Sequence, residues 1–246
     1  MTEQPGQTVV LTGAAGGMGR AITKALLDSG RRVVLVDRDA EALQQLAATV
    51  GDEVFPIQLD VSDSRDVDSL PEAIPAHFKP VEILINNAGH DIGGRTRFDA
   101  GSADDWSNII QTNLIGLMRV TRAILPDMVK RNAGHIVNIS SINAVRIVPD
   151  MAAYSTSKAG VHMFTETLRG ELADTAIRVT ELQPGLTRTN IILTRYRGDK
   201  QKERDYFDQF RMALEPADIA LSIVFALDQP AHVQIAEMMI LPVNRY

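Results

Sequence analysis

The chain has 246 residues, carries a net charge of −6, contains no cysteine, and is 45% hydrophobic and 23% charged. This composition suits one globular domain, excludes disulfides and thiolate metal sites, and provides no basic field for a nucleic-acid partner. The stretch MTEQPGQTVVLTG has no basic and apolar leader, and no apolar run approaches the roughly 18 residues of a membrane-spanning helix, so we expect a soluble, cytoplasmic protein without a membrane partner.

Short β-branched runs alternate along the chain with longer amphipathic stretches. The predicted strands are residues 8–12, 32–36, 54–59, 82–86, 135–139, 177–182 and 237–241, and the predicted helices are 17–29, 40–49, 63–77, 103–131, 151–174 and 216–228. Near-continuous apolar strands separated by helices are typical of parallel sheets covered on both faces. We therefore predict a single α/β domain over residues 1–246, with a doubly wound, seven-stranded parallel sheet and helices on both faces.

A glycine-rich turn follows the first predicted strand. Gly13, Gly17 and Gly19 allow a tight turn, close approach of the backbone to a pyrophosphate, and close packing of the next helix, whose N-terminal amides attract an anion. Such a turn alone is often only a helix cap. Here it lies between a predicted strand and a predicted helix, which is the context that a dinucleotide site requires.

The end of the second predicted strand bears on the choice of cofactor. Asp37 lies 24 residues beyond Gly13, where a carboxylate accepts hydrogen bonds from ribose hydroxyls and repels a 2′-phosphate. Arg38 could instead hold that phosphate, cover the adenine, or pair with Asp39. We expect NAD, with NADP as the alternative.

The segment YSTSK carries the candidate chemistry. Tyr154 and Lys158 are four residues apart, so a helix places the phenol and the ammonium on one face. A cation there favours phenolate and lowers the pKa of the tyrosine toward that of a general acid or base. Ser141 lies thirteen residues upstream in an apolar run and would be the neighbouring hydroxyl. A lone YxxxK is usually a solvated helix face, and the surrounding motifs favour the chemical reading.

These motifs, in this order and together with NNAG at 86–89, resemble the short-chain dehydrogenase/reductase family in its single-domain branch, from about Thr8 to Pro242. The resemblance implies a Rossmann-type fold and an oxidoreductase that transfers a hydride between a nicotinamide cofactor and a secondary alcohol or carbonyl. The alternatives are an NADPH-dependent ketoreductase on larger substrates and a non-catalytic dinucleotide-binding sensor. Sensors typically lose the tyrosine or the lysine, and this chain keeps both.

The resemblance also implies individual roles. Tyr154 is expected to be the general acid or base, Lys158 to lower its pKa and hold ribose hydroxyls, and Ser141 to donate to the substrate oxygen, while Asn113 helps to hold a relay water. Ser140 is the alternative to Ser141. The expected cofactor-binding residues are Gly13, Gly17, Met18, Gly19, Asp37, Arg38, Asp60, Val61, Asn87, Ala88, Gly89, Tyr154, Lys158, Pro184, Gly185, Thr187 and Thr189. Asp60 could instead cap a helix, and the NNAG asparagines could instead support the sheet.

Residues 187–212 are polar and basic, and we predict that they form a substrate-covering loop. Its charges either are solvated or bind an anionic group of the substrate. They are Arg188, Arg195, Arg197, Lys200, Lys202 and Arg204, and Arg95, Arg97 and Arg146 near the expected pocket mouth are similarly ambiguous. His90 and Asp91 could line the pocket. His162 is expected to be packed or exposed, and no histidine or carboxylate spacing indicates a metal site.

The chain ends in AHVQIAEMMILPVNRY rather than in the glycine-rich segment of many relatives. This ending resembles the subgroup that acts on 3-hydroxy acids, serine and related small polar alcohols. The family also forms four-helix dimer interfaces that pair into D₂ tetramers. Because Ile109, Leu117, Met163 and Phe164 give the two long predicted helices more apolar surface than one side of a sheet needs, we expect a homotetramer.

Overall fold

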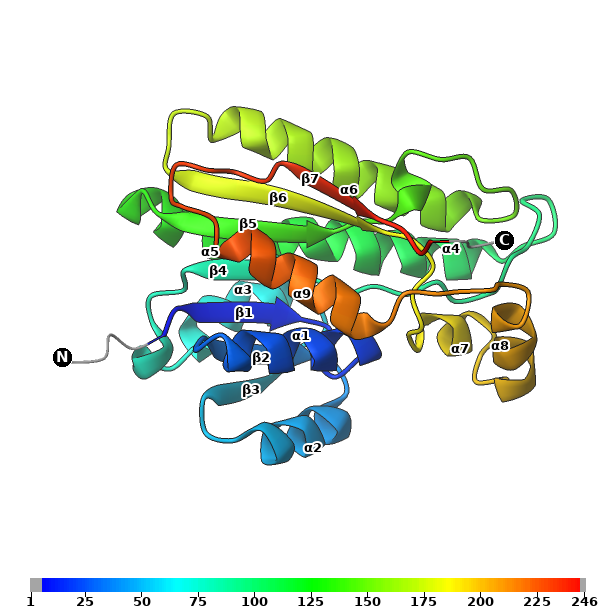
Figure 1. Cartoon of the computed structure of the whole chain (residues 1–246), viewed down its shortest axis with the longest axis horizontal. Helices are drawn as coiled ribbons and strands as arrows, with labels where there is room; N and C mark the ends of the chain where they lie inside the picture. The colour runs from blue at the N-terminus through cyan, green and yellow to red at the C-terminus, as the bar shows by residue number, and fades with distance from the viewer. Residues whose placement is uncertain (1–5, 244–246) are drawn as a thin grey trace.

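The computed structural model describes residues 6–243, which form a seven-stranded parallel sheet of order β3-β2-β1-β4-β5-β6-β7 (Figure 1). Every neighbouring pair of strands is parallel. Val, Ile and Leu fill the central strands, as expected for a sheet buried on both faces. The strands are β1 (Thr8–Thr12), β2 (Arg32–Asp37), β3 (Val54–Gln58), β4 (Ile83–Asn86), β5 (Gly134–Ile139), β6 (Ile177–Pro184) and β7 (Glu237–Ile240).

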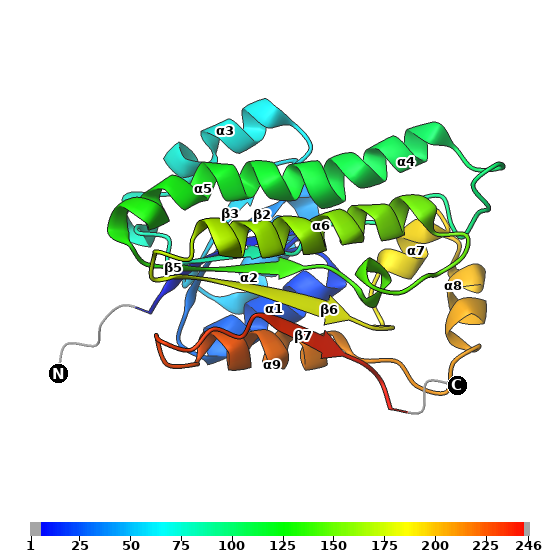
Figure 2. The same ribbon diagram turned by 90° about the horizontal axis from the view of Figure 1, so that it is seen from above.

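Helices cover both faces of the sheet (Figure 2). One face packs against α1 (Gly17–Asp28), α2 (Ala40–Val50) and α9 (Pro216–Leu227), and the other against α3 (Ser64–Ala73), α5 (Leu117–Arg131) and α6 (Ala152–Glu171). Successive residues of β1 enter opposite cores, with Val9 and Leu11 on the first side and Val10 on the second. The predicted Rossmann-type, doubly wound fold is confirmed.

Two helical predictions differ from the structure. The predicted helix 103–131 is α4 (Ala103–Ile110), a π-helical turn, η2 (Gln111–Gly116), and α5. The predicted helix 63–77 ends at Ala73, because Ile74 precedes Pro75 and takes an extended conformation, and a short 3₁₀ turn (Ala76–Phe78) follows.

The region 187–212, which we predicted to be an irregular loop, contains two short helices. They are α7 (Ile191–Arg195) and α8 (Lys200–Phe207), and the Asp199 side chain caps α8 by accepting from the amides of Gln201 and Lys202. Leu186, Ile192, Tyr206 and Phe207 form a small separate core beneath them. The segment is therefore folded and packed, and it is not an irregular loop.

The sheet itself places the candidate site. Strand order reverses between β1 and β4, and a crevice opens at such a point beyond the carboxyl ends of the strands. A cavity of about 740 Å³ lies there, bounded by the glycine turn, β5, α6 and α7. Among the residues that the structure describes, no helix combines the length and hydrophobicity that crossing a bilayer demands.

Candidate active site

The glycine turn is too tight for a side chain at Gly13 or at Gly19. Gly13 has φ +66°, and a Cβ on it would lie 2.8 Å from the Cα of Ala88. A Cβ on Gly19 would lie 2.1 Å from the carbonyl oxygen of Gly13. No side chain caps the N-terminus of α1, which begins at Gly17, and the first residues of this helix line the cavity, as an anion site requires.

Asp37 stands at the carboxyl end of β2 and lines the cavity. One carboxylate oxygen accepts from the Ala15 amide at 2.9 Å and the other from the Asp39 amide at 3.1 Å. The carboxylate is thereby fixed beside the glycine turn. Arg38 is exposed and also lines the cavity.

Asp60 and Val61 line the cavity as well, and the helix-cap alternative for Asp60 is wrong. Asp63 caps α3 by accepting from the Arg65 amide, whereas Asp60 accepts from the amide and hydroxyl of Ser62, at 2.8 and 2.7 Å. Asp60 thus shapes the loop before α3.

The NNAG residues serve both the sheet and the cavity. The Asn87 side chain donates to the carbonyl oxygens of Thr12 and Gly13, at 3.0 and 3.1 Å, which ties β4 to the glycine turn. Asn87, Ala88 and Gly89 line the cavity. Asn87 therefore supports the end of the sheet from within the cavity wall, and its part in binding stays a prediction.

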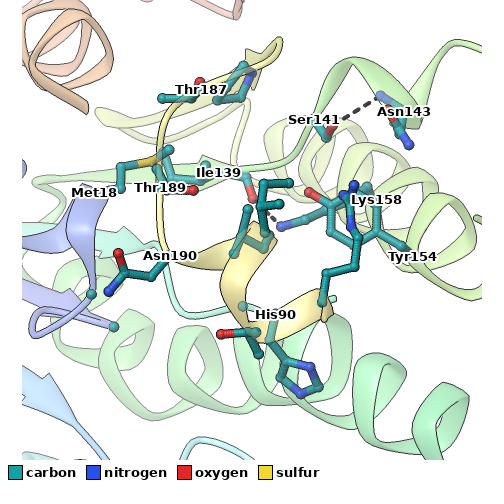
Figure 3. Close-up of a pocket in the computed structure, with 18 of the residues that line it drawn as sticks. Met18, His90, Ile139, Ser141, Asn143, Tyr154, Lys158, Thr187, Thr189 and Asn190 are labelled. Atoms are coloured by element: carbon teal, nitrogen blue, oxygen red, sulfur yellow. Dashed lines mark hydrogen bonds between the residues drawn. The ribbon is translucent and has the colours of Figure 1, made fainter. Parts of the chain in front are cut away.

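Tyr154, Lys158 and Ser141 meet at the cavity, as Figure 3 shows. Lys158 lies one turn after Tyr154 on α6; its Nζ donates to the Ile139 carbonyl at 2.9 Å and stands 5.8 Å from the centre of the Tyr154 ring. The Ser141 hydroxyl also lines the cavity beside the Tyr154 phenol, and it accepts from the Asn143 amide at 3.1 Å. Ser140 directs its hydroxyl to the Glu181 carboxylate, so Ser141 is the better candidate.

Burial is the largest influence on the pKa values of Tyr154 and Lys158. It raises the pKa of Tyr154 to about 12, with the Asp91 carboxylate adding to the effect and the Ser141 hydrogen bond opposing it. Burial also lowers the pKa of Lys158 to about 8, against the charges of Glu181 and Asp91. The expected lowering of the Tyr154 pKa by Lys158 is thus not met in this structure, because desolvation is the larger effect on the phenol.

Asn113 is fully buried in the π-helical turn and does not itself line the cavity. Its Nδ2 donates to the His90 carbonyl at 3.0 Å and to the Ser157 hydroxyl at 3.1 Å, and its Oδ1 accepts from the His90 amide at 2.9 Å. It joins the loop after β4 to α6 directly behind Gly89. Its part in holding a water stays a prediction.

The chain beyond β6 closes one side of the cavity. Pro184, Gly185, Thr187 and Thr189 all line it, as predicted from the resemblance. A Cβ built on Gly17 would lie 3.7 Å from the backbone nitrogen of Asn190, so this segment reaches across to the glycine turn. Figure 3 shows Thr189 and Asn190 facing Met18 across this part of the cavity.

Of the basic residues in this segment, only Arg195 is buried and lines the cavity. Its Nε lies 2.7 Å from Asp91 Oδ2, its guanidinium lies 4.9 Å from the centre of the Tyr206 ring, and among the described residues its Nη1 has no hydrogen-bond partner. Burial raises the pKa of Asp91 to about 6 even beside this cation.

The other charges of the segment are at the surface or paired there. Arg197 pairs with Asp105 at 2.7 Å, Arg188 approaches Glu215 and covers Phe207, and Lys200, Lys202 and Arg204 are exposed. Arg97 pairs with Asp99, whereas Arg95 and Arg146 line the cavity mouth.

Several cavity residues belong to no sequence motif and were not predicted. They include Ile142, Asn143, Asn190, Ile191, Ile192, Thr194, Tyr206, Gln209 and Phe210, together with Arg195, which the sequence did not separate from its neighbours. The apolar and aromatic residues inside an otherwise polar stretch were the available signal.

His162 is packed, as expected, but in a cluster that the sequence did not reveal. Its Nδ1 lies 2.7 Å from Glu181, and ligand atoms of His162, Glu181 and Glu237 all lie within 4.8 Å of one another. Within this cluster, Glu181 is engaged by Ser140 and by His162.

Comparison with known proteins agrees with the site. The family model of short chain dehydrogenases matches residues 7–199. An NADP-dependent 3-hydroxy acid dehydrogenase of Escherichia coli (strain K12) is 37% identical over 239 residues, covering 96% of this chain and 95% of that protein.

Two solved structures are similar over nearly the whole chain. The closed form of a serine dehydrogenase complexed with NADP⁺ has a TM-score of 0.94 at 35% identity and covers 98% of this chain and 96% of its own. An actinorhodin polyketide ketoreductase with NADPH has a TM-score of 0.87 at 29% identity, covering 98% of each chain. The chain therefore belongs to the short-chain dehydrogenase family and is an NAD(P)-dependent oxidoreductase that acts on a CH–OH group or its carbonyl.

Proposed function

We propose that the enzyme oxidises a small 3-hydroxy acid, or reduces the corresponding keto acid, with NAD as the preferred cofactor. The observation that carries the substrate class is Arg195, a buried cation at the cavity with a free Nη1. The relatives named for 3-hydroxy acids and serine support the same class.

A nicotinamide dinucleotide held by the glycine turn, Asp37 and Lys158 would supply the hydride acceptor for oxidation and the hydride donor for reduction. Tyr154 takes the proton of the substrate hydroxyl, or returns it to the carbonyl oxygen, through its phenolic oxygen. Ser141 donates a hydrogen bond to the same substrate oxygen and so stabilises the charge that develops there. Lys158, fixed by the Ile139 carbonyl, holds positive charge beside the phenol, which favours phenolate during turnover.

The substrate carboxylate is proposed to bind Arg195. Asp91 occupies only the Nε edge of the guanidinium, so Nη1 is left to donate to an anion. A buried donor without a partner is costly, and a ligand oxygen would remove that cost. The cavity must hold the dinucleotide as well as the substrate, which favours a small substrate over the larger ones of a ketoreductase.

The cofactor preference rests on Asp37. Its carboxylate is held by two backbone amides at the end of β2, where negative charge opposes a 2′-phosphate. Arg38 and the NADP named for the relatives favour the alternative. The proposed binding set for the cofactor is otherwise the one predicted from the sequence, since all of those residues line the cavity.

We also propose one domain, with 187–212 covering the substrate, in a cytoplasmic homotetramer. The extreme ends of the predicted domain, residues 1–5 and 244–246, lie outside the described residues. Of the residues expected to drive assembly, Ile109 and Leu117 are in the core and Phe164 packs on it, so only Met163 is an exposed candidate. The tetramer is better supported by exposed apolar side chains on opposite sides of the sheet. They are Met118 and Met163 on α5 and α6, and Leu221 and Phe225, one turn apart on α9.

A panel of substrates tests the proposed function. Small 3-hydroxy acids, their methyl esters and neutral secondary alcohols are each offered with NAD and with NADP, and reduced nicotinamide is followed by absorbance. We expect the free acids with NAD to give the highest kcat/KM. Equal rates for acids and esters would contradict it.

A further inference from the structure

Glu181 is a buried carboxylate that the proposed chemistry does not use. It lies in β6, has no exposed surface, and is directed toward α6. It accepts a hydrogen bond from the Ser140 hydroxyl and lies 2.7 Å from Nδ1 of His162. Burying a carboxylate is costly unless it is paired and hydrogen-bonded, so a charge at this position has to be supported from both sides.

Both partners of Glu181 lie close to Lys158 along the chain or next to the residue that binds it. His162 is one turn after Lys158 on α6, and Ser140 directly follows Ile139, whose carbonyl accepts from Lys158 Nζ at 2.9 Å. Lys158 and His162 therefore face the same stretch of the sheet, where β5 and β6 pair Asn138 with Glu181.

We infer that Glu181, held in place by His162 and Ser140, is a positioning residue whose negative charge offsets that of the buried Lys158 ammonium beside Tyr154. The inference rests on the proposed role of Lys158 in catalysis. A buried ammonium loses its hydration, and a nearby carboxylate offsets part of that loss.

The charges around the pair support this assignment. Two carboxylates oppose the lowering of the Lys158 pKa by burial, with Glu181 having the larger effect and Asp91 the smaller. His162 is faced by Glu181, by Glu237 from β7 and by Glu166 on its own helix, and hydrogen bonding to Glu181 raises its pKa. Glu166 is engaged by Arg169, whereas Glu181 is engaged by His162 and by Ser140, which directly follows the residue whose carbonyl holds Lys158.

The experiment measures the Lys158 pKa directly by NMR, in protein carrying ¹³C at the lysine Cε, and needs no substrate. Among the lysines that the structure describes, Lys158 alone is buried, whereas Lys24, Lys79, Lys130, Lys200 and Lys202 are exposed, so its resonance should titrate apart from theirs. The Lys158→Met variant lacks this resonance and thereby identifies it. The parent should titrate near pH 8.

Glu181→Gln removes the charge and keeps the size and the hydrogen-bond acceptor, and it should lower the Lys158 pKa by about one unit or more. Glu166→Gln is the matched control. Glu166 lies on α6 near His162, and its substitution should leave the Lys158 pKa unchanged. If Glu181→Gln does not fold, Glu181→Asp withdraws the carboxylate by one methylene and should lower the pKa by a smaller amount. An unchanged Lys158 pKa in whichever folded variant is measured overturns the inference.

Turnover gives a second reading. The alkaline limb of the kcat profile in Glu181→Gln should move to lower pH, whereas a purely structural defect would lower kcat equally at every pH. If no 3-hydroxy acid reacts but the NMR shift is found, the proposed substrate is wrong and the inference stands. If the acids react but the Lys158 pKa does not move, the inference fails and the proposed function stands.

Discussion

Arg195 and Asp91 form a buried ion pair, with Nε and Oδ2 2.7 Å apart, that joins the segment after β6 to the loop after β4. The pair fixes one wall of the cavity against the other. Because Asp91 binds only one edge of the guanidinium, the same arginine can anchor the covering segment and still bind an anion.

The first prediction concerns this arginine. Arg195→Gln should raise KM for the best hydroxy acid and reduce kcat/KM at least tenfold, because truncating one partner of a buried charge pair costs about 2–5 kcal/mol. Arg197→Gln is the matched control, since Arg197 pairs with Asp105 at the surface. Steady-state kinetics on the acid and its methyl ester give KM and kcat/KM for both variants. A loss that is equal for acid and ester would assign Arg195 to structure alone.

The second prediction concerns the cofactor. The unmodified enzyme should show a higher kcat/KM with NAD than with NADP, and Asp37→Ala should narrow that gap because it removes the negative charge beside the 2′-position. Arg38→Ala is the control and should weaken NADP more than NAD. A clear preference of the unmodified enzyme for NADP would mean that Arg38 outweighs Asp37.

The third prediction concerns assembly. Sedimentation or light scattering should give four times the 26.9 kDa of one chain. Met163→Glu and Leu221→Glu each place a charge on a different exposed apolar face, so each should give dimers, while Gln44→Glu on α2 should leave the tetramer intact. A parent mass near that of the monomer contradicts the proposed assembly.

The fourth prediction concerns stability in acid. His135 is buried in β5 with Nε2 2.8 Å from the Thr180 hydroxyl, and burial lowers its pKa to about 3. The unfolded chain binds a proton near pH 6.5 and the folded one only near 3, so this group's contribution to stability is complete above 6.5 and is lost as the pH falls toward 3. Between pH 7 and pH 4 the loss should be about 3 kcal/mol.

Urea unfolding at several pH values measures this dependence. His135→Gln should flatten it, and the exposed His77→Gln should not. An unchanged slope in His135→Gln would mean that other groups govern the acid sensitivity.

Local patterns predicted most of the fold. The seven strands differ from the prediction by at most two residues at either end, because β-branched runs bounded by polar turns identify buried parallel strands well. The π-helical turn around Asn113 was not predictable in this way. It depends on hydrogen bonds to His90 and Ser157, which lie far away in the sequence.

The residues of the candidate site were likewise predictable only in part. Residues within motifs, such as Gly13, Asp37, Tyr154 and Lys158, were predicted to meet and do line one cavity. Arg195 could not be distinguished from Arg188 or Arg197 by composition, since its burial depends on packing against Asp91 and Tyr206. The raised pKa of Tyr154 was likewise missed, because spacing along a helix does not report desolvation.

Tyr154 is proposed to transfer the proton in a nicotinamide-dependent oxidation or reduction. Comparison of Tyr154→Phe with the parent tests this role, by turnover of the best substrate together with calorimetric binding of the cofactor. Turnover should fall by a factor of at least about a hundred, as it does on removal of a general acid or base, while cofactor affinity should stay near that of the parent. Turnover near that of the parent would contradict it, and a parent that binds the cofactor but transforms no alcohol or ketone would instead be a dinucleotide-binding sensor.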